Sequence, residues 1–373
     1  MRTPRCRIPP SPRLLGALAT AALLACGPAE VPDPIYLVVD WQGQEPPALR
    51  AAAHPELTQQ PLTGLGVRVF AGGRFRYDPA GGPYADRAAL RAAVVVAEGE
   101  PLHLDLRPTQ FGGVRLFAPG DARTLLGLSA WHHLVGARRF LRERGGDERG
   151  CLDALDLYLS APIETPEGTV PSSMAWYGAV PAFVATPYVE DGVPPAANPG
   201  IVAHELTHAL VFCHLDGGDP VRASRPLHPE FARWSGIWLE GIADYVGAAY
   251  SGDARFLRWS LPALDEGRRL DRRRRWPPAD PADPYAGAAI LSAALWSLRG
   301  EIDPVDVDEA VLRSVDAAQA WWDAEEVGTP RTWLQPVVEA LVARGYAASV
   351  VCGALGRSFD ATDVATQCAE RGP

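Results

Sequence analysis

Residues 203–214, AHELTHALVFCH, have the residue types and the spacing of a metal-assisted hydrolytic site. In an α-helix, positions i and i+4 lie on one face, so His204 and His208 can present both imidazoles to one tetrahedral zinc ion. Glu205 then lies beside the water molecule that such a metal activates and can take its proton as a general base. The segment therefore predicts a zinc-dependent hydrolase that acts on peptide bonds.

A third protein ligand is required, and His214 is the first candidate. It stands where the metzincin pattern, HExxHxxGxxH, places its third histidine, but the turn glycine of that pattern is Val211 here. A β-branched valine resists positive φ, so the helix should continue and leave His214 roughly 120° away from the zinc face. The methionine turn that metzincins carry downstream is also missing, because Met1 and Met174 both precede the motif. We therefore expect His214 to be a residue of the helix C-terminus, where an imidazole suits the helix dipole.

The second candidate lies 32 residues beyond His208, in the sequence WLEGIADY. Glu240 and Asp244 are again at positions i and i+4 of an expected helix, so their carboxylates face the same way. The first can bind zinc, and the second can accept a ring N–H from a ligand histidine, which favours His204. Two histidines and one glutamate leave a fourth position for water, as a catalytic zinc site requires.

HELTH followed by EGxAD resembles the gluzincins, the thermolysin-like and fungalysin-like zinc metallopeptidases. The resemblance is specific at five positions and extends over about residues 125–300. It implies one catalytic Zn²⁺ with ligands His204, His208 and Glu240, the base Glu205, and Asp244 behind a ligand. It also implies a zincin-like catalytic domain of the α+β class, in which an edge strand lies over the HExxH helix.

Residues 174–178, MAWYG, resemble the substrate-binding edge strand of that family. Ala175 and Trp176 fit, although Met174 replaces the asparagine of thermolysin-like enzymes. Main-chain hydrogen bonds can still hold a peptide here, as in β-augmentation. Related aminopeptidases carry a glutamate in this strand to hold the free amine of the substrate. Because the strand lacks it, an endopeptidase is favoured, with an aminopeptidase as the alternative.

A donor must also stabilise the oxyanion of the tetrahedral intermediate. Residues 283–296 resemble the later helix of fungalysin-like enzymes that supplies this donor, which makes Tyr285 the candidate. An ungapped match would place the family's histidine at Pro284. A purely structural Tyr285 and a donor at His228 stay open as alternatives.

The pattern of the whole chain indicates an α+β protein. Residues 35–120 hold short β-prone runs separated by glycine and proline, which predicts a small β-rich N-terminal region. Residues 121–373 are expected to form the catalytic domain, with a helical C-terminal part from residue 253. The expected strands are 35–39, 67–70, 102–106, 114–117, 155–159 and 182–189, and the expected helices are 125–144, 199–214, 236–250, 286–298, 307–324 and 333–344.

The N-terminus has the features of an export signal. Four arginines precede a short apolar run that ends in LLAC, similar to the bacterial lipobox, so residues 1–25 are expected to be removed and Cys26 acylated. Residues 26–34 would then be a tether. This predicts an exported protein anchored through its acyl group in a bacterial membrane, the outer membrane or the cell surface, while an ordinary cleaved signal is the alternative.

The charge balance argues against nucleic acid as a partner. Removal of residues 1–25 would take away four arginines and no acid, which changes the net charge from −10 to −14. The strongly basic run at residues 268–275 precedes Trp276 and two prolines and is expected to be a solvated loop after a helix. A protein or peptide substrate is the expected partner.

Four cysteines follow Cys26, as suits an oxidising compartment. Of the three possible pairings, Cys151 with Cys213 and Cys352 with Cys368 is preferred, because the second pair closes a local segment. A non-catalytic binding lipoprotein with a structural zinc is the remaining alternative to an enzyme.

Overall fold

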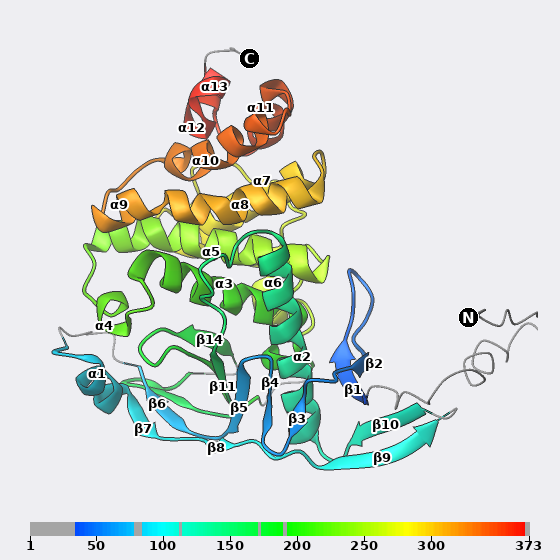
Figure 1. Ribbon diagram of the computed structural model, residues 1–373. Helices are drawn as coiled ribbons and strands as arrows, with labels where there is room; N and C mark the ends of the chain where they lie inside the picture. Colours follow the sequence, from blue (N-terminus) through cyan, green and yellow to red (C-terminus); the bar gives the residue numbers. More distant parts are fainter. Residues whose placement is uncertain (1–33, 78–83, 112–113, 171–172, 189–191, 370–373) are drawn as a thin grey trace, which may run out of the picture.

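The computed structural model describes residues 34–77, 84–111, 114–170, 173–188 and 192–369. Cys26 and the predicted signal segment lie outside these residues. The fold is mixed α and β, with the strands gathered in the first half of the chain and helices throughout the second half (Figure 1), which confirms the predicted α+β class. Within the described part of the chain, no helix is long and apolar enough to cross a bilayer.

The strands form three sheets. The first contains, in spatial order, β2 (Ala48–Ala53), β1 (Ile35–Asp40), β10 (Val114–Pro119) and β9 (Leu106–Phe111). The central sheet contains β14 (Met174–Tyr177), β15 (Ala182–Ala185), β11 (Leu155–Leu159), β5 (Val67–Ala71), β4 (Leu62–Gly64) and β3 (Thr58–Gln59), with β8 (Glu100–Pro101) paired to β5. The third contains β13 (Gly168–Thr169), β12 (Ile163–Thr165), β6 (Arg74–Arg76) and β7 (Val95–Ala97).

The central sheet contains both parallel and antiparallel strand pairs, and the position of a strand in the sheet accounts for the residue types in that strand. β11 pairs in parallel with both β5 and β15, and all four residues of β15 are buried, as expected for a strand covered on both faces. β14 pairs antiparallel with β15 and forms the edge, with Met174 opposite Ala185. Because β5 precedes residue 120 and β11 follows it, the predicted N-terminal region and the predicted catalytic domain contribute strands to one sheet.

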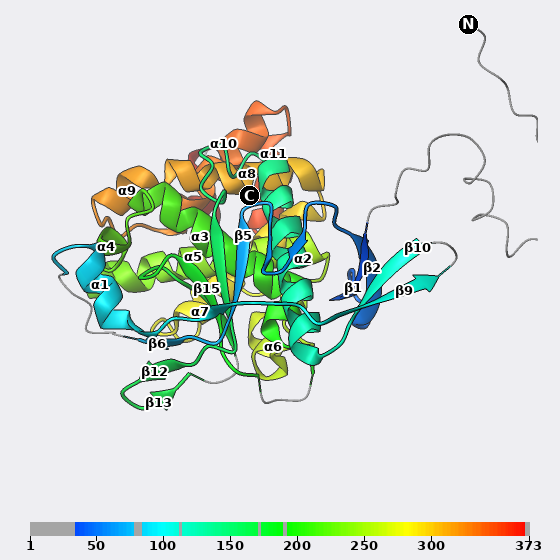
Figure 2. The ribbon, with the colours of Figure 1, turned by 60° about the horizontal axis from the view of Figure 1, so that its bottom comes forward.

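Helices make up the rest of the described chain. They are α1 (Arg87–Val94), α2 (Ala122–Glu143), the 3₁₀ turn η1 (Pro195–Ala197), α3 (Pro199–Asp216), α4 (Pro220–Ala223), α5 (Pro229–Ser251), α6 (Pro262–Arg268), α7 (Pro284–Arg299), α8 (Pro304–Ala317), α9 (Gln319–Asp323), α10 (Pro330–Ala343), α11 (Ala348–Leu355), α12 (Ala361–Val364) and α13 (Thr366–Ala369). Seven of these α-helices begin with proline, whose fixed φ suits the first helical position and whose missing N–H is not needed there. In Figure 1, α3, α5 and α8 lie in successive layers away from the central strands, and both Figure 1 and Figure 2 show α2 beside β1.

Helix α3 is held firmly at both ends. The side chain of Asn198 accepts hydrogen bonds from the N–H groups of Gly200 and Ile201, while its amide nitrogen donates to the carbonyl oxygen of Phe256. Gly217 ends the helix at φ 63°, a conformation that glycine adopts without strain. The predicted start at Asn198–Pro199 is confirmed, and the helix continues through Val211 without a turn, also as predicted.

The close approach of α3 and α5 depends on glycine. A Cβ at Gly247 would come within 2.6 Å of the carbonyl oxygen of Gly200, so a side chain at residue 247 would push the two helices apart. This contact lies two turns beyond Glu240 on α5 and one turn before His204 on α3. It therefore sets the spacing between the two helices that carry the predicted zinc ligands.

The structure differs from the sequence prediction in several elements. The strand expected at residues 182–189 ends at Ala185, and the helix expected at residues 307–324 is divided into α8 and α9. Residues 87–94 form α1, which was not predicted, and the strand expected at residues 102–106 is absent, with β8 ending at Pro101 and β9 beginning at Leu106. Leu102 and Leu104 are nonetheless buried, and the Leu102 N–H donates to the Val69 carbonyl. The alternation that the sequence shows is therefore a burial pattern beside β5 rather than a continuous ladder.

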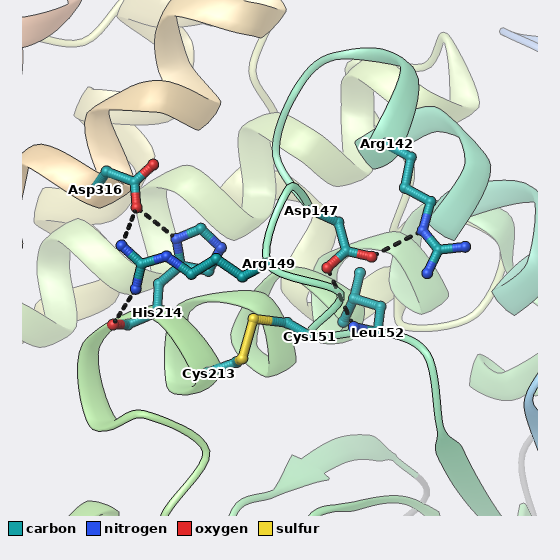
Figure 3. The surroundings of a disulfide bond; sticks show 8 residues. All are labelled: Arg142, Asp147, Arg149, Cys151, Leu152, Cys213, His214 and Asp316. Atoms are coloured by element: carbon teal, nitrogen blue, oxygen red, sulfur yellow. Dashed lines mark hydrogen bonds and ion pairs between the residues drawn. A yellow bond between two sulfur atoms is a disulfide. The ribbon is translucent and has the colours of Figure 1, made fainter.

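Both preferred disulfides are present. Cys151 pairs with Cys213 and Cys352 pairs with Cys368, with Cα–Cα distances of 5.7 and 5.5 Å. The first joins the loop after α2 to the last turn of α3 (Figure 3). It therefore fixes the C-terminal end of the helix that carries His204 and His208.

Candidate metal and catalytic site

Helices α3 and α5 bring three potential metal ligands together. Nε2 of His204 lies 3.2 Å from Nε2 of His208, and these atoms lie 3.5 and 3.4 Å from the two carboxylate oxygens of Glu240. A tetrahedral metal bound at about 2.0–2.2 Å needs its ligand atoms about 3.3 Å apart. The three side chains therefore have the separations that a zinc-sized ion requires, and they form one of the two metal-ligand groups in the described residues.

Asp244 contacts His204, one member of this triad. Its Oδ1 lies 3.1 Å from Nδ1 of His204, on the side of the ring opposite the ligand nitrogen, and its side chain is fully buried. Burial lowers the pKa of His204, but the Asp244 hydrogen bond and the nearby carboxylates outweigh it and leave the pKa above its ordinary value. For His208, burial lowers the pKa to about 4.

Arg268, at the end of α6, is the main residue of this site that was not predicted from the sequence. Its guanidinium donates to Asp244 and to Glu240 Oε2, at 2.6 and 2.9 Å. The prediction that residues 268–275 form a solvated loop was therefore wrong for Arg268, whose side chain is only 13% exposed, whereas Arg272 and Arg275 are exposed and pair with surface acids. No local sequence pattern distinguishes Arg268 from the arginines that follow it. The one indication was that the carboxylates of Glu240 and Asp244, once close together, need a cation.

Glu205 lies next to the ligands but is held by the sheet. One carboxylate oxygen is 3.8 Å from Nε2 of His204, and the other accepts the backbone N–H of Trp176 at 2.7 Å. Burial raises the pKa of Glu205 to about 7, against the lowering effects of His204 and of the Trp176 N–H. The carboxylate is thus placed at the junction between the metal-ligand group and the edge strand.

Alternate residues of the edge strand β14 direct their backbone N–H and C=O groups to its free edge. Because the N–H of Trp176 points to Glu205, its carbonyl points to the same free edge, while the backbone groups of Ala175 face β15. Both residues line the cleft, as do His204, His208 and Glu240. Of the two predicted substrate-binding residues, Trp176 is therefore the one whose backbone groups lie on the free edge of the sheet.

Tyr285 lies at the rim of the cleft, in the first turn of α7. Its side chain is 46% exposed, and the guanidinium carbon of Arg268 lies 4.9 Å from the centre of its ring. The negative charge of Glu240 raises its pKa. His228, the alternative donor, caps α5 and is not among the described residues that line the cleft.

His214 lies away from the ligand triad. Its Nδ1 is 2.9 Å from Asp316 on α8, and Arg149 donates both to Asp316 and to the His214 carbonyl oxygen (Figure 3). The neighbouring Cys213 forms the disulfide with Cys151. His214 therefore serves the junction of α3, α8 and the loop after α2, as its expected place at the helix C-terminus implied.

The cleft in front of the triad has a volume of about 970 Å³. Its lining combines apolar side chains with polar and aromatic ones. The apolar ones include Ile201, Phe256, Leu257, Leu261 and Leu264, and the others include Asp216, Arg225 and Trp322. A cleft of this volume can hold a small-molecule ligand or a few residues of an extended peptide.

A second group of potential metal ligands lies beside α2. Asp40, His132 and His133 place one ligand atom each within 4.8 Å of one another. Burial lowers the pKa of His133 to about 3, and burial together with His132 lowers the pKa of the adjoining His54 to about 4. The sequence analysis did not identify this group, because Asp40 is 92 residues before His132.

Comparison with known proteins adds no assignment. No model of a protein family matches the chain, and no curated protein matches its sequence.

Proposed function

We propose that this chain is a zinc-dependent metallopeptidase of the gluzincin type that cleaves internal peptide bonds. The observation that carries the proposal is the combination of a metal-sized ligand triad with a carboxylate beside it, at the base of an open cleft bordered by a sheet edge. Bound zinc would lower the pKa of a water molecule and polarise the scissile carbonyl.

The residues around the triad have complementary roles in this proposal. Glu205 takes a proton from the attacking water and returns it to the leaving amine, while Asp244 holds His204 in the tautomer that binds metal through Nε2. The Trp176 N–H keeps Glu205 directed into the cleft, and the Trp176 carbonyl is available to a substrate N–H. Tyr285 stands at the rim as a donor to the developing oxyanion.

The proposal is tested with the Glu205→Gln variant of the full chain. This variant should bind zinc with the wild-type stoichiometry and lose about 10²–10⁴-fold in the rate of casein or peptide cleavage, because only the general base is removed. Glu230→Gln makes the same chemical change at an exposed position of α5 and should leave cleavage unchanged. Full activity in Glu205→Gln would exclude the mechanism, and zinc binding without cleavage by the wild type would favour a binding protein.

Endopeptidase and aminopeptidase activities are distinguished by the substrate terminus. We expect peptides with an acetylated N-terminus to be cleaved as fast as free peptides, because residues 174–177 contain no glutamate to hold a substrate amine. Cleavage of free peptides alone, one residue at a time, would assign the chain to the aminopeptidase alternative.

We also propose that the protein is exported and lipid-anchored through Cys26, on the strength of the LLAC sequence. Expressed in a bacterial host, the wild type should incorporate labelled palmitate and sediment with membranes, and Cys26→Ala should do neither. Unlabelled wild-type protein would favour the ordinary cleaved signal.

A further inference from the structure

The group of Asp40, His132 and His133 joins two rigid elements. Asp40 ends β1, and the two histidines are neighbours in the middle of α2. None of the three lines the cleft of the proposed active site. Their ligand atoms lie within 4.8 Å of one another, which is close enough for one ion to bind all three after small side-chain movements.

The environment of His133 leaves one ring nitrogen without a suitable partner. Its side chain is only 1% exposed, its Nε2 lies 2.9 Å from the carbonyl oxygen of Val39, and the carbonyl of Ala197 also faces the ring. A neutral imidazole carries one N–H and can fully satisfy only one of these two acceptors. A cation at the other nitrogen would remove the mismatch, and Val39 would then offer its carbonyl oxygen to the same ion.

His132 has the kind of support that metal-binding histidines need. Its Nδ1 lies 2.9 Å from Nε2 of His54, which follows β2. When His132 donates its Nδ1–H to His54, the lone pair of its Nε2 is free to bind a metal. His54 is buried and packs edge-on against the ring of Trp131, so its position is fixed.

Two further groups face the cluster and define its charge. Burial and then the negative charge of Asp40 raise the pKa of Tyr250 from α5, while burial and, to a smaller extent, the positive charge of Arg139, two turns along α2, lower the pKa values of His54 and His132. The positive charge of Arg139 disfavours the binding of a cation at this group, while the negative charge of Asp40 favours it. The donor set of two imidazoles and one carboxylate is typical of zinc and neighbouring transition metals rather than of calcium.

We propose that Asp40, His132 and His133 bind a second divalent transition metal ion, best matched by zinc, which fastens β1 to α2, with His54 as the residue that positions His132. This site is separate from the proposed catalytic site and does not depend on peptidase activity.

Zinc stoichiometry tests the proposal directly. The full-length protein should bind two equivalents, and a His204→Ala/His208→Ala double variant should bind one. Adding His132→Ala to the double variant should leave none. Zinc should also raise the melting temperature of the double variant, which reports binding without reference to activity. His103→Ala, at an exposed histidine that pairs with Gln60, is the matched control and should leave two equivalents.

Three further variants keep the test decisive if His132→Ala fails to fold. Asp40→Asn preserves size and should also remove one equivalent. His54→Gln should weaken the second site about 10–100-fold, as is usual for removal of a supporting partner. Arg139→Gln should strengthen it, because a repelling charge is removed. A double variant that binds no zinc, or an Asp40→Asn protein that still binds two equivalents, would overturn the proposal. A protein that binds two equivalents of zinc but does not cleave peptides would refute the proposed function and would not affect the proposal of a second site.

Discussion

Oδ1 of Asp244 lies 3.1 Å from Nδ1 of His204, across two helices and 40 residues of sequence. The contact joins a fully buried carboxylate to a histidine whose other nitrogen faces His208 and Glu240. It therefore determines which nitrogen of His204 is available to a metal. Metal binding through Nε2 of His204 depends on that choice of tautomer.

The Asp244→Asn variant should bind zinc about 10–100-fold more weakly, because an amide supports the required tautomer of His204 less well than a carboxylate does. Competition with a chelator measures the affinity. Asp271→Asn, at an exposed aspartate that pairs with Arg269, is the control and should bind as the wild type does. Equal affinities of the two variants would mean that His204 does not need Asp244.

Replacement of Arg268 by Met should destabilise the zinc-free protein by about 3 kcal/mol, because it leaves the buried carboxylate of Asp244 without its cation. Urea unfolding measures this free energy. Arg275→Met removes an exposed pair with Asp360 and should cost less than about 1 kcal/mol. Similar losses of stability in both variants would mean that Arg268 is a solvated side chain, as the sequence predicted.

Glu240→Ala should abolish tight zinc binding at the catalytic site, whereas His214→Asn should retain it, because Nδ1 of His214 faces Asp316 and not the triad. Zinc content after dialysis distinguishes the two, because Glu240→Ala should hold one equivalent fewer than His214→Asn, with the proposed second site intact in both. The opposite result, with zinc lost from His214→Asn and kept by Glu240→Ala, would show that a different third ligand completes the site.

The two disulfides should contribute unequally to stability. They link residues 62 and 16 positions apart, for which loop-closure entropy gives about 4 and about 3 kcal/mol. The Cys151→Ala/Cys213→Ala pair should therefore unfold at lower denaturant than Cys352→Ala/Cys368→Ala. An equal or reversed order would show that packing, rather than chain entropy, decides their contributions.

The free energy of unfolding should depend on pH through the carboxylate of Asp121. Its carboxylate accepts the N–H of Thr124 at 2.7 Å, and this bond lowers its pKa below the ordinary 3.8. The folded state therefore holds fewer protons than the unfolded state near that pH. The contribution is complete above about pH 4 and is lost as the pH falls through the lower, folded pKa.

Comparison of wild type with Asp121→Asn and Asp121→Ala isolates this effect. The alanine variant should lose about 1 kcal/mol at neutral pH through loss of the helix cap, while the asparagine variant keeps the cap without the titration. The stability advantage of the wild type over Asp121→Asn should shrink only below about pH 4. An advantage independent of pH would show that the Asp121 charge plays no part.

The sequence determined the local features of this protein. The i, i+4 spacing of His204 and His208 and of Glu240 and Asp244, the start of α3 at Pro199, and its continuation past Val211 all follow from helix geometry and capping, which act within a few residues. The preferred disulfide pairing was also right. The helical features and the local Cys352–Cys368 pair need no knowledge of what the helices pack against, whereas Cys151 and Cys213 are 62 positions apart and meet only in the folded chain.

Which side chains distant in the sequence come into contact depends on the tertiary structure. Arg268 became part of the site because its side chain, at the end of α6, reaches the carboxylates of Asp244 and Glu240 on α5, and Asp40 met His132 because β1 packs beside α2. A buried carboxylate selects its cation by proximity in three dimensions, and many arginines in the chain are equally suitable by sequence. The physical reason is that burial, which makes an unpaired charge costly, is a property of the packed molecule and has no signature at a fixed spacing along the chain.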